Sequence, residues 1–148
     1  LRSATVDSLV SLQVIEHLWD LPAFWAEVRR VVRPGGRVVI STPNRVTFSP
    51  GLARGQKPTN PFHVEEFDAH QLAALLAEAG FSEVRVLGLR HGPRLADEDV
   101  VARQIQAILA DEWPTDLVQL VAAVTCEDFL LGAIDPDLDL DLVAVARR

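Results

Sequence analysis

The chain has 148 residues, about one domain's worth, with 49% hydrophobic residues and a net charge of −7. This composition excludes a disordered chain, and the negative charge argues against a general binder of the nucleic-acid backbone. No apolar run reaches the roughly 18 residues of a membrane span, and no basic, apolar leader opens the sequence. The single cysteine allows no internal disulfide. We therefore expect a cytoplasmic protein without nucleic-acid or membrane partners.

The start of the sequence is unusual. The chain contains no methionine, and strand-like residues begin almost at once. We therefore expect that further residues precede Leu1 in the complete translation product, and that residues 1–148 are the C-terminal portion of a single domain.

The first predicted strand covers residues 6–12 and ends in a cluster of polar side chains. Gln13, Glu16 and His17 follow it directly, and a helix is expected after Asp20. Ligands of parallel α/β sheets bind outside the carboxyl ends of the strands. This junction is therefore where we expect the chemistry.

A helix is predicted from residue 21, because apolar residues recur there at helical spacing. Asp20 can cap it, and the Pro-Gly-Gly run at 34–36 is expected to end it, with Arg33 in its last turn. Residues 37–41 form the next strand, and their β-branched run predicts burial on both faces. Strand, helix and strand together predict a parallel βαβ unit.

Residues 42–61 contain four prolines and no periodicity, which predicts a lid or binding loop. A second helix is expected after Asp68 as its cap. Gly80 then provides the left-handed end of a Schellman-type motif, with Phe81 as the apolar residue that follows. A third strand is expected at 84–87.

An acidic, helical insertion is predicted at about 96–134. It is expected to hold two amphipathic helices and a short helix with a capping box at 125–128. The apolar faces of the two longer helices are expected to be Val101, Ile105, Ile108 and Leu109, and Leu117, Val118, Val121 and Val124. The insertion would form an acceptor-side cap or a contact between two copies in a homodimer. Residues 137–146 predict a last strand whose exposed start becomes buried, which completes an α/β fold.

Four blocks carry a resemblance to a known family: Leu-Gln-Val-Ile-Glu-His-Leu at 12–18, Val-Val-Arg-Pro-Gly-Gly at 31–36, Val-Ile-Ser-Thr-Pro-Asn at 39–44 and Glu-Ala-Gly-Phe at 78–81. Their order and spacing resemble the second half of a class I S-adenosylmethionine-dependent methyltransferase. This resemblance implies a Rossmann-like fold, with a mostly parallel sheet, an antiparallel last strand and the N-terminal part of the domain missing.

A narrower resemblance is to actinobacterial sugar O-methyltransferases linked to methylglucose lipopolysaccharide synthesis. It rests on residues 13–20, 41–44 with 47–50, 60–63 and 91–95. It implies that an oligosaccharide or another small molecule is the methyl acceptor. The chain departs from the family pattern because the glycine-rich loop and the acidic residue that grips the ribose are absent from it. We therefore expect these 148 residues alone to be inactive.

The resemblance assigns roles at the first junction. A sugar hydroxyl is a weak nucleophile, so we expect His17 to act as general base and Glu16 to orient it. Ser11, Leu12, Gln13 and Leu18 are expected beside the cofactor S-adenosylmethionine. The alternative is structural: His17 would hold the strand–helix junction by hydrogen bonds, and the others would form a local turn.

Acceptor contacts are expected from His63, at the end of the predicted lid, and from Arg45 and Arg94. Each arginine is otherwise a solvated surface charge. The three tryptophans, Trp19, Trp25 and Trp113, are interpreted as core or interface residues rather than as sugar platforms.

A metal site is the second hypothesis at the junction. Some O-methyltransferases carry Glu-x-x-Glu-His after this strand and bind Mg²⁺. Here Gln13 takes the first position, which leaves Glu16, His17 and the distant His63. One carboxylate, one amide and two imidazoles are a weak set for Mg²⁺, which prefers oxygen ligands.

The leading prediction is an S-adenosylmethionine-dependent methyltransferase that acts on a saccharide hydroxyl. Two alternatives from other classes stay open. One is a non-catalytic partner or remnant, a half-domain that folds against another chain. The other is a different Rossmann-like enzyme such as a dehydrogenase, against which the Glu16–His17 pair and the last strand argue.

Overall fold

The structure is a computed structural model that describes residues 1–97, 100–135 and 138–148, except for the side chains of Asp97, Val101 and Ile105. The chain divides into two compact units, residues 1–89 with 131–148, and residues 90–130. Within the described ranges, no helix is long and apolar enough to cross a membrane. That residues 1–148 are the C-terminal portion of one domain stays a prediction.

The sheet has five strands in the order β1-β2-β5-β3-β4. β1 pairs with β2 in parallel, and β5 pairs with both β2 and β3 in antiparallel orientation. β1, β2 and β3 therefore run in one direction, and the antiparallel last strand is confirmed. The strands are β1 (Val6–Leu12), β2 (Val32–Pro43), β3 (Ser82–His91), β4 (Phe129–Gly132) and β5 (Asp141–Arg147).

Helix α1 (Leu21–Val31) begins as predicted, since the Asp20 carboxylate accepts a hydrogen bond from the N–H of Ala23 at 2.9 Å. Its predicted end is wrong. β2 begins at Val32, so the Pro-Gly-Gly run and Arg33 lie in the strand. The run forms a bulge there, because the register moves from Val6 opposite Val32 to Ser8 opposite Arg37.

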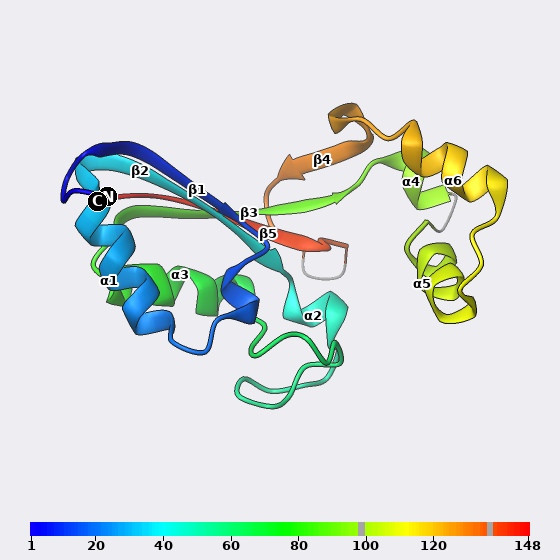
Figure 1. Ribbon diagram of the computed structural model, residues 1–148, viewed down its shortest axis with the longest axis horizontal. Helices are drawn as coiled ribbons and strands as arrows, with labels where there is room; N and C mark the ends of the chain where they lie inside the picture. The colour runs from blue at the N-terminus through cyan, green and yellow to red at the C-terminus, as the bar shows by residue number, and fades with distance from the viewer. Residues whose placement is uncertain (98–99, 136–137) are drawn as a thin grey trace. The chain divides into compact units, whose positions relative to one another are not determined.

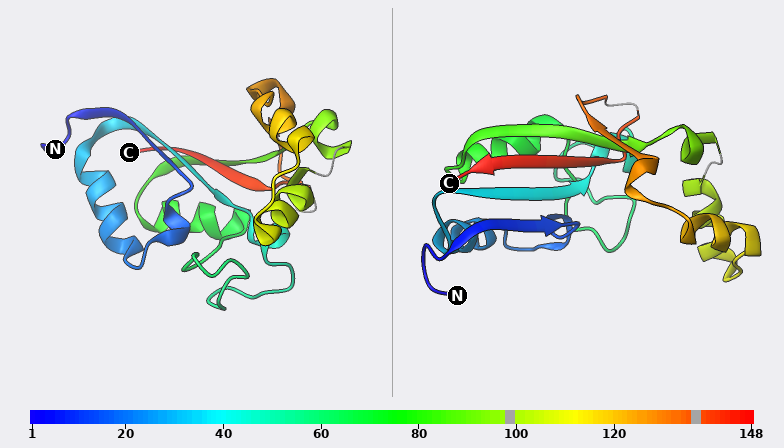
Figure 2. Two further views of the ribbon diagram at one scale, coloured as in Figure 1. Left: turned by 45° about the vertical axis from the view of Figure 1, so that its right-hand side comes forward. Right: turned by 90° about the horizontal axis from the view of Figure 1, so that it is seen from above.

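Helix α3 (Ala69–Glu78) has both predicted ends. Asp68 and Gln71 form a capping box, Gly80 has a φ of +81°, and the N–H of Phe81 reaches the carbonyl of Leu76 at 3.0 Å. α1 and α3 lie on the same face of the sheet (Figures 1 and 2). The core between them and the sheet includes Trp25, Val28, Val38, Ile40, Phe67, Leu72, Leu76 and Leu142.

Burial of strand residues 37–41 on both faces, which the sequence predicted, is not found. Val38 and Ile40 are fully buried, whereas Val39 is half-buried and Arg37 is exposed. The reason is that no described helix of the first unit lies on the face opposite α1 and α3 (Figure 2).

The second unit holds α4 (Pro93–Asp97), α5 (Val100–Ala110), α6 (Thr115–Ala122) and the short helix η2 (Cys126–Asp128). The capping box of η2 is present as predicted. The predicted apolar faces are only partly buried. Leu117 is 1% exposed, whereas Ile108, Leu109 and Val118 are exposed. The side chains of Val101 and Ile105 lie outside the described residues, as do residues 98–99 of the insertion.

The start of the last strand differs from its prediction. β5 begins at Asp141, and Asp139 before it is fully buried rather than exposed. The Asp139 carboxylate accepts a hydrogen bond from the N–H of Asp135 at 2.6 Å, which compensates its burial. Asp137 lies outside the described residues.

Candidate active site

The polar cluster after β1 is positioned by a short turn of 3₁₀ helix, η1 (Ile15–His17). The Ile15 side chain is 1% exposed and anchors the turn in the core. The carbonyl of Glu16 accepts the N–H of Val64 at 2.7 Å, which ties the turn to the chain beyond the predicted lid. The turn therefore directs Glu16 inward and His17 outward.

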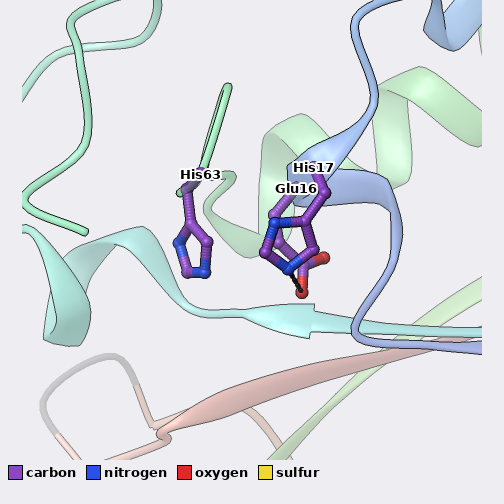
Figure 3. Close-up of side chains that lie close together, drawn as sticks. All are labelled: Glu16, His17 and His63. Carbon is purple, nitrogen blue, oxygen red and sulfur yellow. Dashed lines mark ion pairs between the residues drawn. The ribbon is translucent and has the colours of Figure 1, made fainter. Parts of the chain in front are cut away.

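His17 is held in one tautomer by its surroundings. Its Nδ1 lies 3.0 Å from the carbonyl oxygen of Phe62. Since a carbonyl only accepts, Nδ1 carries the hydrogen and Nε2 keeps the lone pair of the neutral ring. Nε2 lies 3.7 Å from Oε1 of Glu16 (Figure 3), and the side chain is about half exposed. His17 can therefore take a proton from a group that reaches it from solvent.

Glu16 is a buried acid, with its side chain 1% exposed. Its Oε2 accepts a hydrogen bond from the hydroxyl of Thr42, at the end of β2, at 3.0 Å. This leaves Oε1 facing His17. A carboxylate in this position stabilises positive charge that develops on the imidazole.

His63 is buried and held by a chain of hydrogen bonds whose direction is determined. The N–H of Phe62 donates to Oδ1 of Asn60 at 3.0 Å, so the amide nitrogen of Asn60 donates to Nε2 of His63 at 3.0 Å. Nδ1 of His63 therefore donates to Oε1 of Glu66 at 2.6 Å. The ring also packs edge-on against His17, with centroids 4.9 Å apart. Both ring nitrogens are in use, so His63 supports His17 rather than offering a second base.

Glu16, His17 and His63 are close enough to hold a cation, since one ligand atom from each lies within 4.8 Å of the others. The donor set does not suit Mg²⁺, because it contains one carboxylate and two imidazoles, one of them already bonded to Asn60. Gln13, the fourth residue of the predicted metal set, is not part of this cluster.

Gln13 is fixed at the end of β1 in an unusual backbone conformation. Its φ is +54°, in the left-handed region, and its N–H bonds the carbonyl of Ser41 at 3.0 Å. The side-chain amide donates to Oγ of Ser41 at 3.2 Å and to Oδ1 of Asp141 at 3.1 Å. The side-chain oxygen of Gln13 is thereby directed away from both partners.

Asp141, at the start of β5, is the site residue that sequence reasoning missed. Burial raises the pKa of its carboxyl to about 6, the hydrogen bond from Gln13 lowers it, and the nearby charge of Glu16 raises it. No local signal marks Asp141, because it is one of several acids that alternate with leucine before the last strand. Only the pairing of β5 with β2 brings it beside Gln13.

Replacing Asp141 with asparagine should stabilise the protein at neutral pH. The folded state binds the carboxyl proton more tightly than the unfolded state, whose pKa is near 3.8, so stability falls as pH rises from about 4 to about 6. Above pH 6 the ionised carboxyl lowers the free energy of unfolding by on the order of 2–3 kcal/mol. Asparagine removes this loss, and its side-chain oxygen still accepts the hydrogen bond from Gln13.

Urea denaturation of both proteins at pH 4 and pH 8 measures this effect. We expect the variant to be the more stable at pH 8 and the two to differ little at pH 4. An equal difference at both pH values would show that the Asp141 carboxyl does not titrate as described.

The remaining predicted residues are spread more widely. Ser11 and Leu18 are half-buried and Leu12 is exposed, so these three flank the junction. Arg45, at the start of α2 (Arg45–Phe48), pairs with Asp68 at 2.6 Å. Arg94 lies in the second unit and pairs with Asp128, where hydrogen bonds from the guanidinium and from the N–H of Thr125 hold the pKa of that carboxyl well below its usual range. The contacts of these residues with a cofactor or acceptor stay predictions.

A pocket of about 430 Å³ opens beside the two histidines. Trp25 is buried as predicted, whereas Trp19 is 89% exposed and is not a core residue, so an interface place for Trp19 stays a prediction. Trp19 follows η1 at the surface, where its ring borders the pocket. The lining residues are His17, Trp19, Gly55, Lys57, Pro61, Phe62, His63 and Val64.

Known proteins resemble the chain in sequence and in fold. Residues 2–86 match the family model of a methyltransferase domain. The whole chain is 46% identical to a Mycobacterium tuberculosis protein named as a probable S-adenosylmethionine-dependent methyltransferase, and it spans 57% of that relative's length. Over 62% of the chain, it is 30% identical to a ubiquinone biosynthesis O-methyltransferase of Brucella anthropi, of which it covers 40%.

A solved structure shows the same fold. The chain is similar, with a TM-score of 0.62, to an S-adenosylmethionine-dependent methyltransferase of Thermotoga maritima. The match covers 99% of this chain and 58% of that one, at 14% sequence identity. It supports the Rossmann-like fold class.

Proposed function

Since the chain belongs to the methyltransferase-domain family, we propose that it carries the acceptor side of an S-adenosylmethionine-dependent O-methyltransferase whose acceptor is a saccharide hydroxyl. The observation that carries this proposal is the orientation of His17. Its Nδ1 is bonded to the carbonyl of Phe62, which leaves Nε2 free to take a proton beside the carboxylate of Glu16.

S-adenosylmethionine supplies an electrophilic methyl group on a sulfonium. When it is bound, the methyl group would go to the acceptor oxygen, and the part of this chain would be to take the hydroxyl proton on Nε2 of His17. Glu16 stabilises the resulting imidazolium, and the carbonyl of Phe62 keeps the ring in place. The protein's main task is to align the two reactants.

We assign the residues at the end of β1 to one side of the cofactor. Leu12 is 57% exposed at the carboxyl end of this edge strand, and Gln13 follows it with its amide orientation fixed by Ser41 and Asp141. Polar and apolar groups that are exposed at a strand end are typical of ligand sites in α/β proteins. Ser11, Leu12, Gln13 and Leu18 are the residues that we assign to this contact.

Two observations support oxygen as the acceptor atom. A hydroxyl needs a base before it attacks, and the site provides one, since Nε2 of His17 is unprotonated in the neutral tautomer. In addition, the Brucella anthropi relative is named as an O-methyltransferase. The choice of a saccharide rests on the resemblance of residues 13–20, 41–44 with 47–50, 60–63 and 91–95 to sugar O-methyltransferases.

Calorimetry and a transfer assay on the complete gene product test the proposal. We expect S-adenosylhomocysteine to bind, and labelled methyl groups to pass from S-adenosylmethionine to a saccharide. EDTA should leave the rate unchanged, because no step requires a metal. A complete gene product that binds no S-adenosylhomocysteine would favour the alternative, a non-catalytic half-domain that folds against another chain. Binding with transfer only to nitrogen would contradict the assignment of oxygen.

A further inference from the structure

Two large aromatic rings stand exposed in the pocket beside His17. Trp19 is 89% exposed and Phe62 is 79% exposed, and both line the same 430 Å³ pocket. We propose that these two rings form the platform on which a pyranose ring of the acceptor stacks, with Lys57 donating hydrogen bonds to its hydroxyl groups. This inference rests on the proposed function and names residues that would select its substrate.

Exposure of two such rings at one place calls for an explanation. Single exposed apolar residues are common on protein surfaces, but neighbouring exposed rings in a concave site are typical of binding sites. Trp25, by contrast, is 5% exposed and packs against Phe24 and Phe81 in edge-on contacts. The fold can thus bury a tryptophan, and Trp19 is not buried in this way.

The backbone of Phe62 couples this platform to the base. Its N–H is bonded to Asn60 and its carbonyl to Nδ1 of His17, so the residue that presents the ring also orients the imidazole. A sugar that stacks on Phe62 would therefore lie at a defined place relative to Nε2 of His17. Such alignment is the main contribution that an enzyme makes to a displacement reaction.

Lys57 adds the polar part of the site. It is the single lysine of the chain, it is exposed, and it borders the pocket. Among the residues that the structure describes, no acid forms an ion pair with it. Its three N–H groups are available to hydroxyl oxygens of a ligand.

Two exposed aromatic rings together with a lysine fit a sugar better than a flat aromatic acceptor. One face of a pyranose carries C–H groups, which pack on the negative face of an aromatic ring, while its hydroxyls need hydrogen-bond donors at the edge. A flat apolar molecule would favour a closed, mainly apolar cavity. Here the rings lie open to solvent, with a cation and two imidazoles nearby.

The test is a titration of the complete gene product with methyl α-D-glucopyranoside and a linear glucose tetrasaccharide, followed by ¹⁵N NMR of the tryptophan indoles. We expect the Trp19 signal to shift and those of Trp25 and Trp113 to stay. Trp19→Ala and Phe62→Ala should each weaken tetrasaccharide binding about tenfold, in keeping with the loss of one aromatic contact, and Trp19→Phe should retain part of it. Trp113→Ala is the matched control, because Trp113 is 44% exposed but does not line the pocket.

The possible results distinguish a failure of the aromatic platform from a failure of the proposed function. Sugar binding that is unchanged in Trp19→Ala and Phe62→Ala would overturn the platform and leave sugar methylation standing. A Trp19 shift with 4-hydroxybenzoate but with neither sugar would overturn the sugar assignment and favour an aromatic acceptor. A shift with glucose 6-phosphate alone would show that Lys57 selects an anion, which also contradicts the inference as stated.

Discussion

Replacing His17 with asparagine should lower kcat of methyl transfer by about 10²- to 10⁴-fold, the range expected when a general base is lost. The amide nitrogen of asparagine occupies the place of Nδ1, so the hydrogen bond to the carbonyl of Phe62 is kept. What is lost is the lone pair on Nε2. The variant should therefore fold normally and bind S-adenosylhomocysteine as the parent does. Initial rates, calorimetry and thermal unfolding measure the three quantities.

His70→Asn is the matched control, since His70 is an exposed histidine on α3. Its kcat should equal that of the parent. If His17→Asn keeps its turnover with unchanged stability, His17 is a structural residue of the junction and the base is another group. If His17→Asn loses stability instead, the His17→Gln variant distinguishes a packing defect from the loss of the base.

Glu16→Gln should lower kcat roughly 10- to 30-fold and leave KM for the acceptor nearly unchanged. A glutamine oxygen still accepts the hydroxyl of Thr42, so the buried hydrogen bond remains. The negative charge 3.7 Å from Nε2 of His17 disappears. Two charges at about 4 Å interact by about 4 kcal/mol in a partly solvated site, and the half-exposed imidazole reduces this to roughly 1.4–2 kcal/mol.

Glu65→Gln provides the comparison for this variant, because Glu65 is close in sequence to the site but its side chain pairs with Arg54 at 3.1 Å. We expect no change in kcat from it. A rise in KM with constant kcat in Glu16→Gln would mean that Glu16 helps to bind the acceptor and does not stabilise charge on His17.

The starts of α1 and α3 and the end of α3 were predictable because they depend on contacts over three or four residues. Asp20 and Asp68 cap α1 and α3, and Gly80 ends α3 with a positive φ, all as expected. The end of α1 was not predictable in the same way. Pro-Gly-Gly is as compatible with a strand bulge as with a helix stop, and the pairing of β2 with β1 selects the bulge.

The junction after β1 was also located correctly, because a polar cluster behind an apolar strand is a local pattern. The roles within it depend on distant parts of the chain. His17 and His63 look equivalent in the sequence, yet Asn60 and Glu66 occupy both nitrogens of His63, while the carbonyl of Phe62 leaves Nε2 of His17 free. Strand β4 was missed because four residues give too little periodicity to recognise.

The sequence by itself determined the α/β class, the strand that leads to the site and the polar residues at its end, since each rests on short-range periodicity and capping. Tertiary structure alone decided the chemical state of those residues. Nearly 130 residues separate Gln13 from Asp141, and 45 separate His17 from Phe62, yet both pairs are hydrogen-bonded. The physical reason is that the pKa of a carboxyl and the tautomer of an imidazole depend on burial and on hydrogen-bond partners, which only the folded chain brings together.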